Sequence, residues 1–438
     1  MASGTWTTQN KVRPGVYVNI ESAPKALGTL GDRGVVSIPL LLSWGEPKTV
    51  ITVEAGEDTR HKLGYPIADE SLSLIGEALK RAGKLLVYRV NTGTKAAATS
   101  GSLTVTAKWG GIRGNDLAIV VAKNIEDENL FDVKTMLKGE LVHSQTVSAI
   151  SELASNEWVT FEGTGELAAT AGVPLAGGAN GTATVQDYLD YLTAIELQDF
   201  NTIALPSTDI ALKAAFASFA KRLRDDEGKK IQVVLENYPS ADYEGVISVK
   251  NGVILDNGSA LSAAQATAWV AGATAGADVN ESLTYAAYDG AVDASPRYTN
   301  SQIIAALQAG ELVFTANNGR AVVEQDINSL TSFTPEKGKA FSKNRVIRVL
   351  DAASNDLVRI FSNFYLGKVP NNDDGRNLLK GECINYLTTL QNISAIQSFD
   401  GQTDIAVTAG AEADVTVIDL AVQPVDSIEK IYTTITVR

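Results

Sequence analysis

The sequence predicts a multidomain α/β (α+β) protein with a mixed sheet core covered by helices. A strand, a helix and a strand follow one another between Asn201 and Glu236, and such βαβ units form parallel sheets covered by helices. Between Thr92 and Gly181, short strands alternate with glycine turns, which is typical of an inserted β-sandwich or barrel. Two strongly amphipathic helices between Lys343 and Gln391 are followed by strands, which predicts a C-terminal domain built on a helix pair.

The first 91 residues contain an arm and the first part of the α/β core. The small, polar segment Met1–Asn10 predicts a flexible arm, and Arg13–Ile20 predicts a strand that follows it. After a loop rich in glycine, the pattern predicts an apolar strand at Val35–Leu42. A helix at Asp69–Ala82, with apolar residues at helical spacing, then leads to a buried strand at Lys84–Val90.

The inserted β-rich region is expected to contain at least five strands. They are Leu103–Trp109, Leu117–Lys123, Phe131–Leu137, Leu141–Val147 and Trp158–Gly163. Because the α/β pattern resumes after Gly181, we interpret residues 92–181 as an insertion into the larger domain.

The second part of the core runs from residue 182 to 335. Thr184 is a suitable N-cap for its first helix. Two short strands at Val246–Leu255 are separated by Asn251 and Gly252, and this pattern predicts a hairpin. The other predicted elements are helices at Asp209–Arg224, Ser262–Ala275 and Asn300–Leu307, and strands at Asn201–Leu205, Lys230–Glu236, Leu312–Ala316 and Ala321–Glu324.

The last quarter of the chain is the most strongly patterned. Lys343–Leu366 places its apolar residues on one helical stripe, and the polar turn Asn371–Gly375 follows it. A second helix at Arg376–Gln391 is expected to pack antiparallel to the first. Two strands are predicted after it, at Ile405–Val407 and Val415–Val422.

The final segment, Ile428–Arg438, predicts a strand that continues to the last residue. This strand could be the edge of its own domain's sheet, or it could complete a sheet in a neighbouring subunit by strand addition. Arg13–Ile20 alternates in the same way and is a candidate partner. The residues predicted to link subunits are Val16, Tyr17, Val18, Ile20, Ile431, Tyr432, Thr433, Ile435 and Val437.

Composition argues against several classes of protein. A net charge of −14 is unlike that of proteins that neutralise phosphates, so we expect no nucleic-acid partner. Cys383 is the only cysteine, which excludes an intramolecular disulfide. The N-terminal residues lack the apolar segment of a signal peptide, and no stretch has the apolar length of a membrane span. We therefore expect the protein to fold in the cytoplasm where it is made and not to insert into a membrane.

No catalytic, cofactor or metal residues are predicted. His61 and His143 are the only histidines, and neither has the spacing of a metal-binding or catalytic motif. The glycine-rich Gly177–Gly181 lacks the spacing of a dinucleotide-binding loop, so we interpret it as a hinge or turn. In Asn371–Gly375, a calcium loop would require Pro370 at a carboxylate position.

A basic run precedes and begins the first C-terminal helix, with no acid between its members. Cations at a helix N-terminus oppose the helix dipole, so a solvated helix face is a weaker interpretation than a partner surface that bears carboxylates. The run consists of Lys337, Lys339, Lys343, Arg345 and Arg348.

Four segments resemble the tail sheath protein of contractile phage tails, and the resemblance extends through nearly the whole chain. It is strongest to sheaths of phages and phage-derived particles of Gram-positive bacteria. The segments are Arg13–Ile20, Phe341–Asp351, Gly367–Arg376 and Gln423–Arg438.

The resemblance implies a structural subunit, not an enzyme, with no cofactor. Many copies would form stacked rings of a helical sheath around a tail tube and contract to drive the tube through a cell envelope. The expected partners are other copies, the tail tube protein, and baseplate and tail terminator proteins. The inserted domain would face outward, and Lys343, Arg345 and Arg348 would contact the tube. The location would be a virion tail or phage-tail-like particle, assembled in the host cytoplasm.

Three alternatives to the sheath of an infectious phage remain. They are the sheath of a phage-tail-like bacteriocin, an α/β enzyme with an unrecognised site, and a surface-layer or other lattice protein.

The patterns described above also define the predicted domain organisation. The predicted domains are an N-terminal arm (1–22), the first part of the α/β domain (23–91), the β-rich insertion (92–181), the second part of the α/β domain (182–335), the C-terminal domain (336–424) and the C-terminal arm (425–438).

Overall fold

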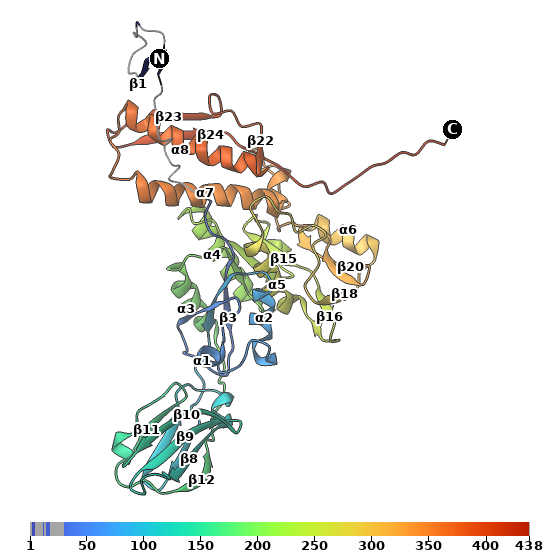
Figure 1. Cartoon of the computed structure of the whole chain (residues 1–438). Coiled ribbons are helices and arrows are strands. Elements are labelled where there is room, and N and C mark those ends of the chain that lie inside the picture. Colours follow the sequence, from blue (N-terminus) through green and yellow to red (C-terminus); the bar gives the residue numbers. More distant parts are fainter. Residues whose placement is uncertain (1, 5–11, 13–14, 18–29, 438) are drawn as a thin grey trace. The chain divides into compact units, whose positions relative to one another are not determined.

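A computed structural model describes residues 2–4, 12, 15–17 and 30–437 (Figure 1). The chain divides into two compact units. The larger unit consists of Gly31–Asn355 and Pro424–Arg438, and the smaller one of Met1–Leu30 and Asp356–Gln423. Helices occur together with several separate sheets, which confirms the predicted multidomain α/β fold.

A seven-stranded sheet forms the centre of the larger unit, with the strand order β19-β15-β14-β13-β3-β5-β4. All neighbouring pairs are parallel except β4 and β5, which are antiparallel. β13 pairs directly with β3, so the chain returns to the same sheet after the insertion. The strands are β3 (Val35–Leu40), β4 (Val50–Glu54), β5 (Lys84–Arg89), β13 (Thr202–Ala204), β14 (Gln232–Glu236), β15 (Val246–Val249) and β19 (Glu311–Leu312).

The sheet separates two hydrophobic cores. In β5, Leu85 and Val87 belong to one core while Leu86 and Tyr88 belong to the other, as the two-residue period of a strand requires. The first core includes residues of α2 (Ser73–Leu79) and α5 (Ala263–Gly276), and the second includes residues of α3 (Val185–Glu196) and α4 (Ile210–Asp225). The sheet is therefore covered by helices on both faces.

Close packing of α5 on α2 accounts for two glycines of α5. A Cβ added at Gly272 would lie 2.2 Å from the carbonyl oxygen of Ala78, and one added at Gly276 would lie 2.0 Å from that of Arg81. Nearly every side chain of α5 is buried, so its alanine-rich sequence reflects a helix enclosed by protein. A capping box between Ser262 and Gln265 begins this helix.

The insertion is a β-sandwich. One sheet has the strand order β10-β9-β8-β12 and the other β11-β7-β6, and a core of apolar side chains lies between them. The sequence missed β6 and β12, which are short and have exposed or half-buried side chains. The strands are β6 (Ala97–Ser100), β7 (Leu103–Ala107), β8 (Leu117–Lys123), β9 (Phe131–Leu137), β10 (Glu140–Val147), β11 (Val159–Glu162) and β12 (Thr170–Pro174).

The buried Arg89 connects the central sheet to the entry linker of the sandwich and to a loop within the sandwich. Its guanidinium donates hydrogen bonds to the carbonyl oxygens of Gly45 at 2.7 Å, Gly110 at 2.5 Å and Thr92 at 3.2 Å. Burial lowers the pKa of Arg89 to about 10. Asn91 adds a hydrogen bond to the carbonyl oxygen of Asn180 in the returning linker, so the glycine-rich exit is held in place by side chains that precede the insertion.

The hairpin predicted at Val246–Leu255 is wrong. β15 joins the central sheet, while β16 (Gly252–Leu255) pairs with β17 (Ala260–Leu261) and β18 (Ala291–Ser295) in a separate sheet. Asn251 does not form a turn, because its side chain exchanges hydrogen bonds with the backbone of Phe314 at 2.9 and 2.8 Å. The remaining elements of the larger unit are α1 (Arg60–Leu63), α6 (Asn300–Gln308), β20 (Phe314–Asn317) and β21 (Arg320–Val323).

The smaller unit contains a helix pair and a hairpin. α7 (Asn344–Phe364) begins in the larger unit and ends in the smaller one, where α8 (Asp373–Asn392) packs against it through a 2.8 Å hydrogen bond from Tyr386 to Asp356. α8 begins at Asp373, three residues before its predicted start, because the side chain of Asn372 caps it. The short strands are β1 (Ala2–Gly4), β2 (Gly15–Tyr17), β22 (Ile396–Gln397), β23 (Ile405–Ala409), β24 (Thr416–Leu420) and β25 (Gln423–Pro424).

We predict that Gly272→Ala lowers the free energy of unfolding by about 1–3 kcal/mol, because the new methyl group must displace the backbone of α2. Gly381→Ala is the matched control, since its Cβ would meet nothing within 4 Å in α8. The control is expected to gain up to about 1 kcal/mol from helix propensity. Urea unfolding followed by circular dichroism measures both variants, and equal stability of the two would contradict the packing argument.

Candidate arm-anchoring site

The C-terminal arm, defined as residues 427–437, contains no helix or strand in the structure, and Figure 1 draws it as an extended trace. Its apolar side chains are exposed, with Ile431 at 81%, Tyr432 at 91%, Ile435 at 86% and Val437 at 91%. Thr433 is exposed as well. Within the described residues the arm therefore forms no edge of its own domain's sheet, and its pairing with a neighbouring subunit stays a prediction.

The predicted N-terminal strand is seen only in part. Val16 and Tyr17 lie in β2, which pairs in parallel with β1 of the same chain, so that Ser3 lies opposite Val16. Val18 and Ile20 lie outside the described residues. Part of the segment expected to be flexible is thus a strand, and the partner of β2 in this structure is its own N-terminus.

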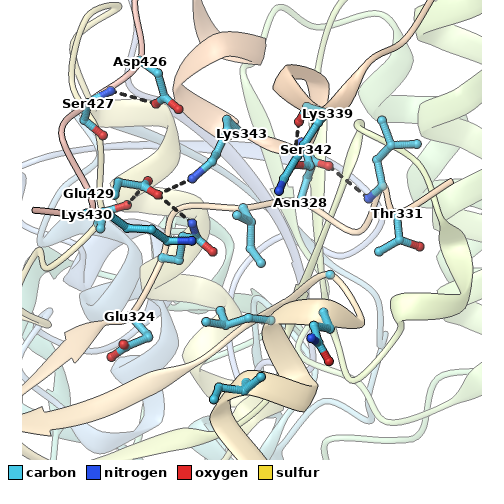
Figure 2. A pocket seen from close by; sticks show the side chains of 18 of the residues that line it. Glu324, Asn328, Thr331, Lys339, Ser342, Lys343, Asp426, Ser427, Glu429 and Lys430 are labelled. Atoms are coloured by element: carbon cyan, nitrogen blue, oxygen red, sulfur yellow. Dashed lines mark hydrogen bonds and ion pairs between the residues drawn. The ribbon is translucent and has the colours of Figure 1, made fainter. Parts of the chain in front are cut away.

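Glu429 is the exception within the arm, because its side chain is only 11% exposed. One carboxylate oxygen accepts a hydrogen bond from the hydroxyl of Thr284 at 2.9 Å. The other accepts from the Gln325 amide at 2.6 Å and forms an ion pair with Lys343 (Figure 2). Three separate segments of the larger unit hold this one carboxylate.

Two members of the basic run have carboxylate partners within the chain. Lys343 pairs with Glu429, and Arg348, which is 1% exposed, lies 3.5 Å from Asp326. Arg345 is also buried and donates to the carbonyl oxygen of Asn280 at 2.9 Å. These three side chains are thus directed to partners within the chain, and their contact with a tube stays a prediction that this burial does not favour.

The charge of Arg345 is influenced by the residues just before the arm. Burial lowers the pKa of the Arg345 guanidinium, and the carboxylate of Asp426 opposes that shift. Asp426 and Glu429 thus supply negative charge to the beginning of α7, where the helix dipole alone would disfavour cations.

A buried polar network supports the side chains that hold Glu429. Asp326 accepts hydrogen bonds from the backbone of Leu283 at 3.0 Å and from the Asn344 side chain at 2.9 Å. Asn344 also accepts from Gln232 at 3.1 Å, which ties the start of α7 to the central sheet. Because buried polar groups with fixed partners have few alternative arrangements, the network holds Lys343 in place.

A hollow of about 890 Å³ lies beside the Glu429 carboxylate (Figure 2). Its walls combine apolar side chains, such as Ile304 and Phe333, with the polar ends of Asn328 and Lys339. No histidine or cysteine is among its lining residues. In the part of the chain that the structure describes, no group of three or more His, Cys, Asp or Glu residues could hold a metal ion.

The two histidines and the polar turn before α8 lie in different elements of the chain. His61 contacts Glu157 at 2.5 Å on the exposed surface, and His143 lies in β10 of the sandwich. Asn371–Gly375 forms the approach to α8 and its first turn. Among the described helices, none is long and apolar enough to cross a membrane.

Comparisons with known proteins agree with this architecture. Four sequence profiles match in order: a tail sheath protein Gp18 domain III N-terminal region (residues 33–90), a phage tail sheath protein β-sandwich domain (91–180), a phage tail sheath protein central domain (181–329) and a phage tail sheath C-terminal domain (336–438).

Individual relatives extend over almost the whole chain. The crystal structure of a sheath tail protein from Desulfitobacterium hafniense is 66% identical, with a TM-score of 0.87 over 96% of this chain and 99% of that one. The phage-like element PBSX protein XkdK of Bacillus subtilis (strain 168) is 42% identical over 99% of both chains. The helical sheath of the anti-feeding prophage in its contracted state shares the fold at 14% identity, with a TM-score of 0.56 over 98% of this chain and 99% of that one.

The chain therefore belongs to the phage tail sheath protein family. It is a subunit of a tail sheath, as the sequence resemblance indicated.

The sequence indicates the arm but not the contacts of Glu429 that anchor it. Thr284, Gln325 and Lys343 are separated from Glu429 by 145, 104 and 86 residues. One signal was present, because Glu429 is the only acid in the segment Ile428–Arg438, which otherwise holds apolar, aromatic and threonine residues and two basic ones. A single acid in a segment of strand-forming residues indicates that this residue has a role other than strand pairing.

Acid is expected to release the arm from its anchor. Burial raises the pKa of Glu429, but the partners Lys343, Gln325 and Thr284 outweigh it and hold the pKa below the ordinary value of 4.5. The interaction is therefore fully present above pH 4.5 and is lost as the pH falls through the lowered pKa. A spin label attached to Ile431→Cys should therefore become more mobile as the pH falls from 4.5 through the lowered pKa of Glu429.

The matched control is the same label in a Glu429→Gln chain, whose mobility should not change with pH in that range because residue 429 no longer titrates. An equal acid response of both labelled chains would contradict the assignment. The native Cys383 is buried and should not react with the label.

Proposed function

We propose that this sheath subunit polymerises as stacked rings around a tail tube and contracts to drive the tube through a cell envelope. In this proposal the arms join copies by strand addition, and the chain has no enzymatic role. The observation that carries the proposal is the exposed arm, whose β-forming residues have no strand partner among the described residues.

The smaller unit offers a site that accepts such an arm. β23 and β24 form a two-stranded antiparallel sheet, and in the part of the chain that the structure describes neither pairs with a third strand. Open strand edges are templates for pairing with another chain. Val417 in β24 is 42% exposed, so a neighbouring strand would have an apolar side chain to cover.

Magnitudes indicate where the stability of such a joint comes from. Ordering each arm residue costs about 1–2 kcal/mol, and each new hydrogen bond contributes about 1 kcal/mol net, so the ladder alone gains little. Burial of an isoleucine or valine side chain contributes about 1.5–3 kcal/mol. Ile431, Ile435 and Val437 therefore supply the net stability in this proposal.

Strand addition also allows movement within an assembly that stays connected. A contact between two different surfaces, repeated from copy to copy, forms an open helical polymer unless it closes into a ring. If flexible arms carry the connection, the folded units can slide while the arms stay paired. The free energy of contraction then comes from new contacts between subunits and requires no nucleotide.

The other partners in this proposal are the tail tube, the baseplate and a tail terminator, without nucleic acid or membrane insertion. The expected location is a virion tail or phage-tail-like particle assembled in the host cytoplasm. In this proposal Lys343, Arg345 and Arg348 support the beginning of the C-terminal arm and do not contact the tube, because their side chains are directed to partners within the chain.

A sheath of a phage-tail-like particle is the second candidate. It is supported by the 42% identical relative, which is named as part of a phage-like element. Electron microscopy of particles from the native host distinguishes the two, since a phage tail carries a DNA-filled head and a bacteriocin-like particle does not.

We predict that a chain truncated after Lys430 folds normally but forms no tubes. The truncation removes the exposed part of the arm and retains the Glu429 anchor, so the thermal midpoint of unfolding should not change. Electron microscopy at several protein concentrations measures assembly of the truncated and the full-length chain. Tubes of normal length from the truncated chain would contradict strand addition by the C-terminal arm.

A further inference from the structure

Glu429 is held far more firmly than its neighbours in the arm. Ile428 is 87% exposed and Ile431 is 81% exposed, whereas the Glu429 carboxylate is enclosed by Thr284, Gln325 and Lys343. Figure 2 shows the carboxylate directed toward Lys343, with Lys430 beside it at the edge of the same hollow. One residue therefore determines where the free part of the arm begins.

Stability alone is a weak reason for this arrangement. A buried ion pair must overcome the cost of removing two charges from water, and apolar replacements often stabilise a protein as well or better. The best-attested use of such pairs is to fix a register or a state. The interaction here holds an arm whose apolar side chains are all exposed, which favours a positional role.

The arm's own sequence specifies its register poorly. A one-residue slip moves every side chain to the opposite face, but a two-residue slip keeps the same face. On one face the order is Ile431, Thr433, Ile435 and Val437, and on the other Tyr432, Thr434 and Thr436. After a two-residue slip, β-branched side chains on the first face again meet the positions that β-branched side chains had occupied, and only Tyr432 on the second face breaks the repeat. The paired segment therefore does little by itself to exclude that slip.

The length of chain between the last fixed residue and the paired segment limits this two-residue slip. With Glu429 held, free chain begins at residue 430, whereas a released arm gains up to the five residues that follow β25, which ends at Pro424. Five additional residues span about 16 Å when extended, at roughly 3.3 Å per residue. A two-residue slip requires about 7 Å, so the anchored arm resists a displacement that a released arm accommodates easily.

We infer that Glu429, held by Lys343, is a positioning residue that sets the register in which Ile431–Val437 adds to the sheet of another copy of this chain. The inference rests on the proposed strand addition, which it deepens. The anchor also shortens the tether, which raises the effective concentration of the arm at the acceptor sheet.

Disulfide mapping between two copies tests the register. One copy carries Ile435→Cys, and a second copy carries one cysteine at a time along β23 and β24. With the native anchor, cross-links should concentrate at one position. In Glu429→Ala, the preference for that position over its neighbours two residues away should fall about tenfold.

Two further variants control for unrelated effects. Lys343→Met removes the anchor from the opposite side and should spread the cross-links in the same way. Lys430→Ala changes the side chain next to Glu429, which takes no part in the Glu429 contacts with Thr284 and Gln325. The cross-links of this variant should match those of the native chain. The thermal midpoint of unfolding is measured for each variant to establish that the subunit remains folded.

The outcomes separate the inference from the function on which it rests. A single unchanged cross-link position in both Glu429→Ala and Lys343→Met would overturn the positioning role while supporting strand addition. The absence of cross-links and of tubes with the native anchor would instead reject strand addition itself.

Discussion

The C-terminal arm depends on backbone partners that the described part of the chain does not provide. The described strands of the larger unit lie in sheets, and the central sheet is covered by helices on both faces. The exposed arm is the exception, with alternating β-forming residues in contact with water. Its hydrogen bonds and apolar side chains gain a partner only when another strand or sheet is supplied, which makes association the natural consequence of this fold.

The position of the arm is controlled from within the folded unit. Lys343 stands at the start of α7, which is tied to the central sheet through Asn344 and Gln232 and to α4 through the buried pair between Arg224 and Asp351. A displacement of α7 relative to that sheet would therefore also move the point at which the arm leaves the subunit. In the proposed assembly, the anchor would thus couple the fold of the core to the contact between copies without lying in that contact itself.

Much of the fold could be predicted from local patterns, because they act over a few residues. The βαβ unit, the α7 and α8 pair and the existence of a sandwich follow from periodicity and turn residues. Two of the errors share a physical cause, which is a distant partner. Asn251 resembles a turn residue until Phe314 supplies its hydrogen bonds, and Lys343 resembles a free cation until Glu429, 86 residues later, supplies the acid. Such pairs are set by the tertiary fold, so no window of the sequence reveals them.

Donor and acceptor are different parts of the same chain, since the arm follows residue 426 and the open hairpin is β23 and β24. A row of copies joined by arms would therefore be polar. One end would display an unused strand, and the other an unused sheet edge. These ends differ chemically, because the first presents exposed apolar side chains on a flexible segment and the second presents fixed backbone donors and acceptors. Two structurally distinct proteins are needed to terminate such a row, one that offers an edge and one that offers a strand.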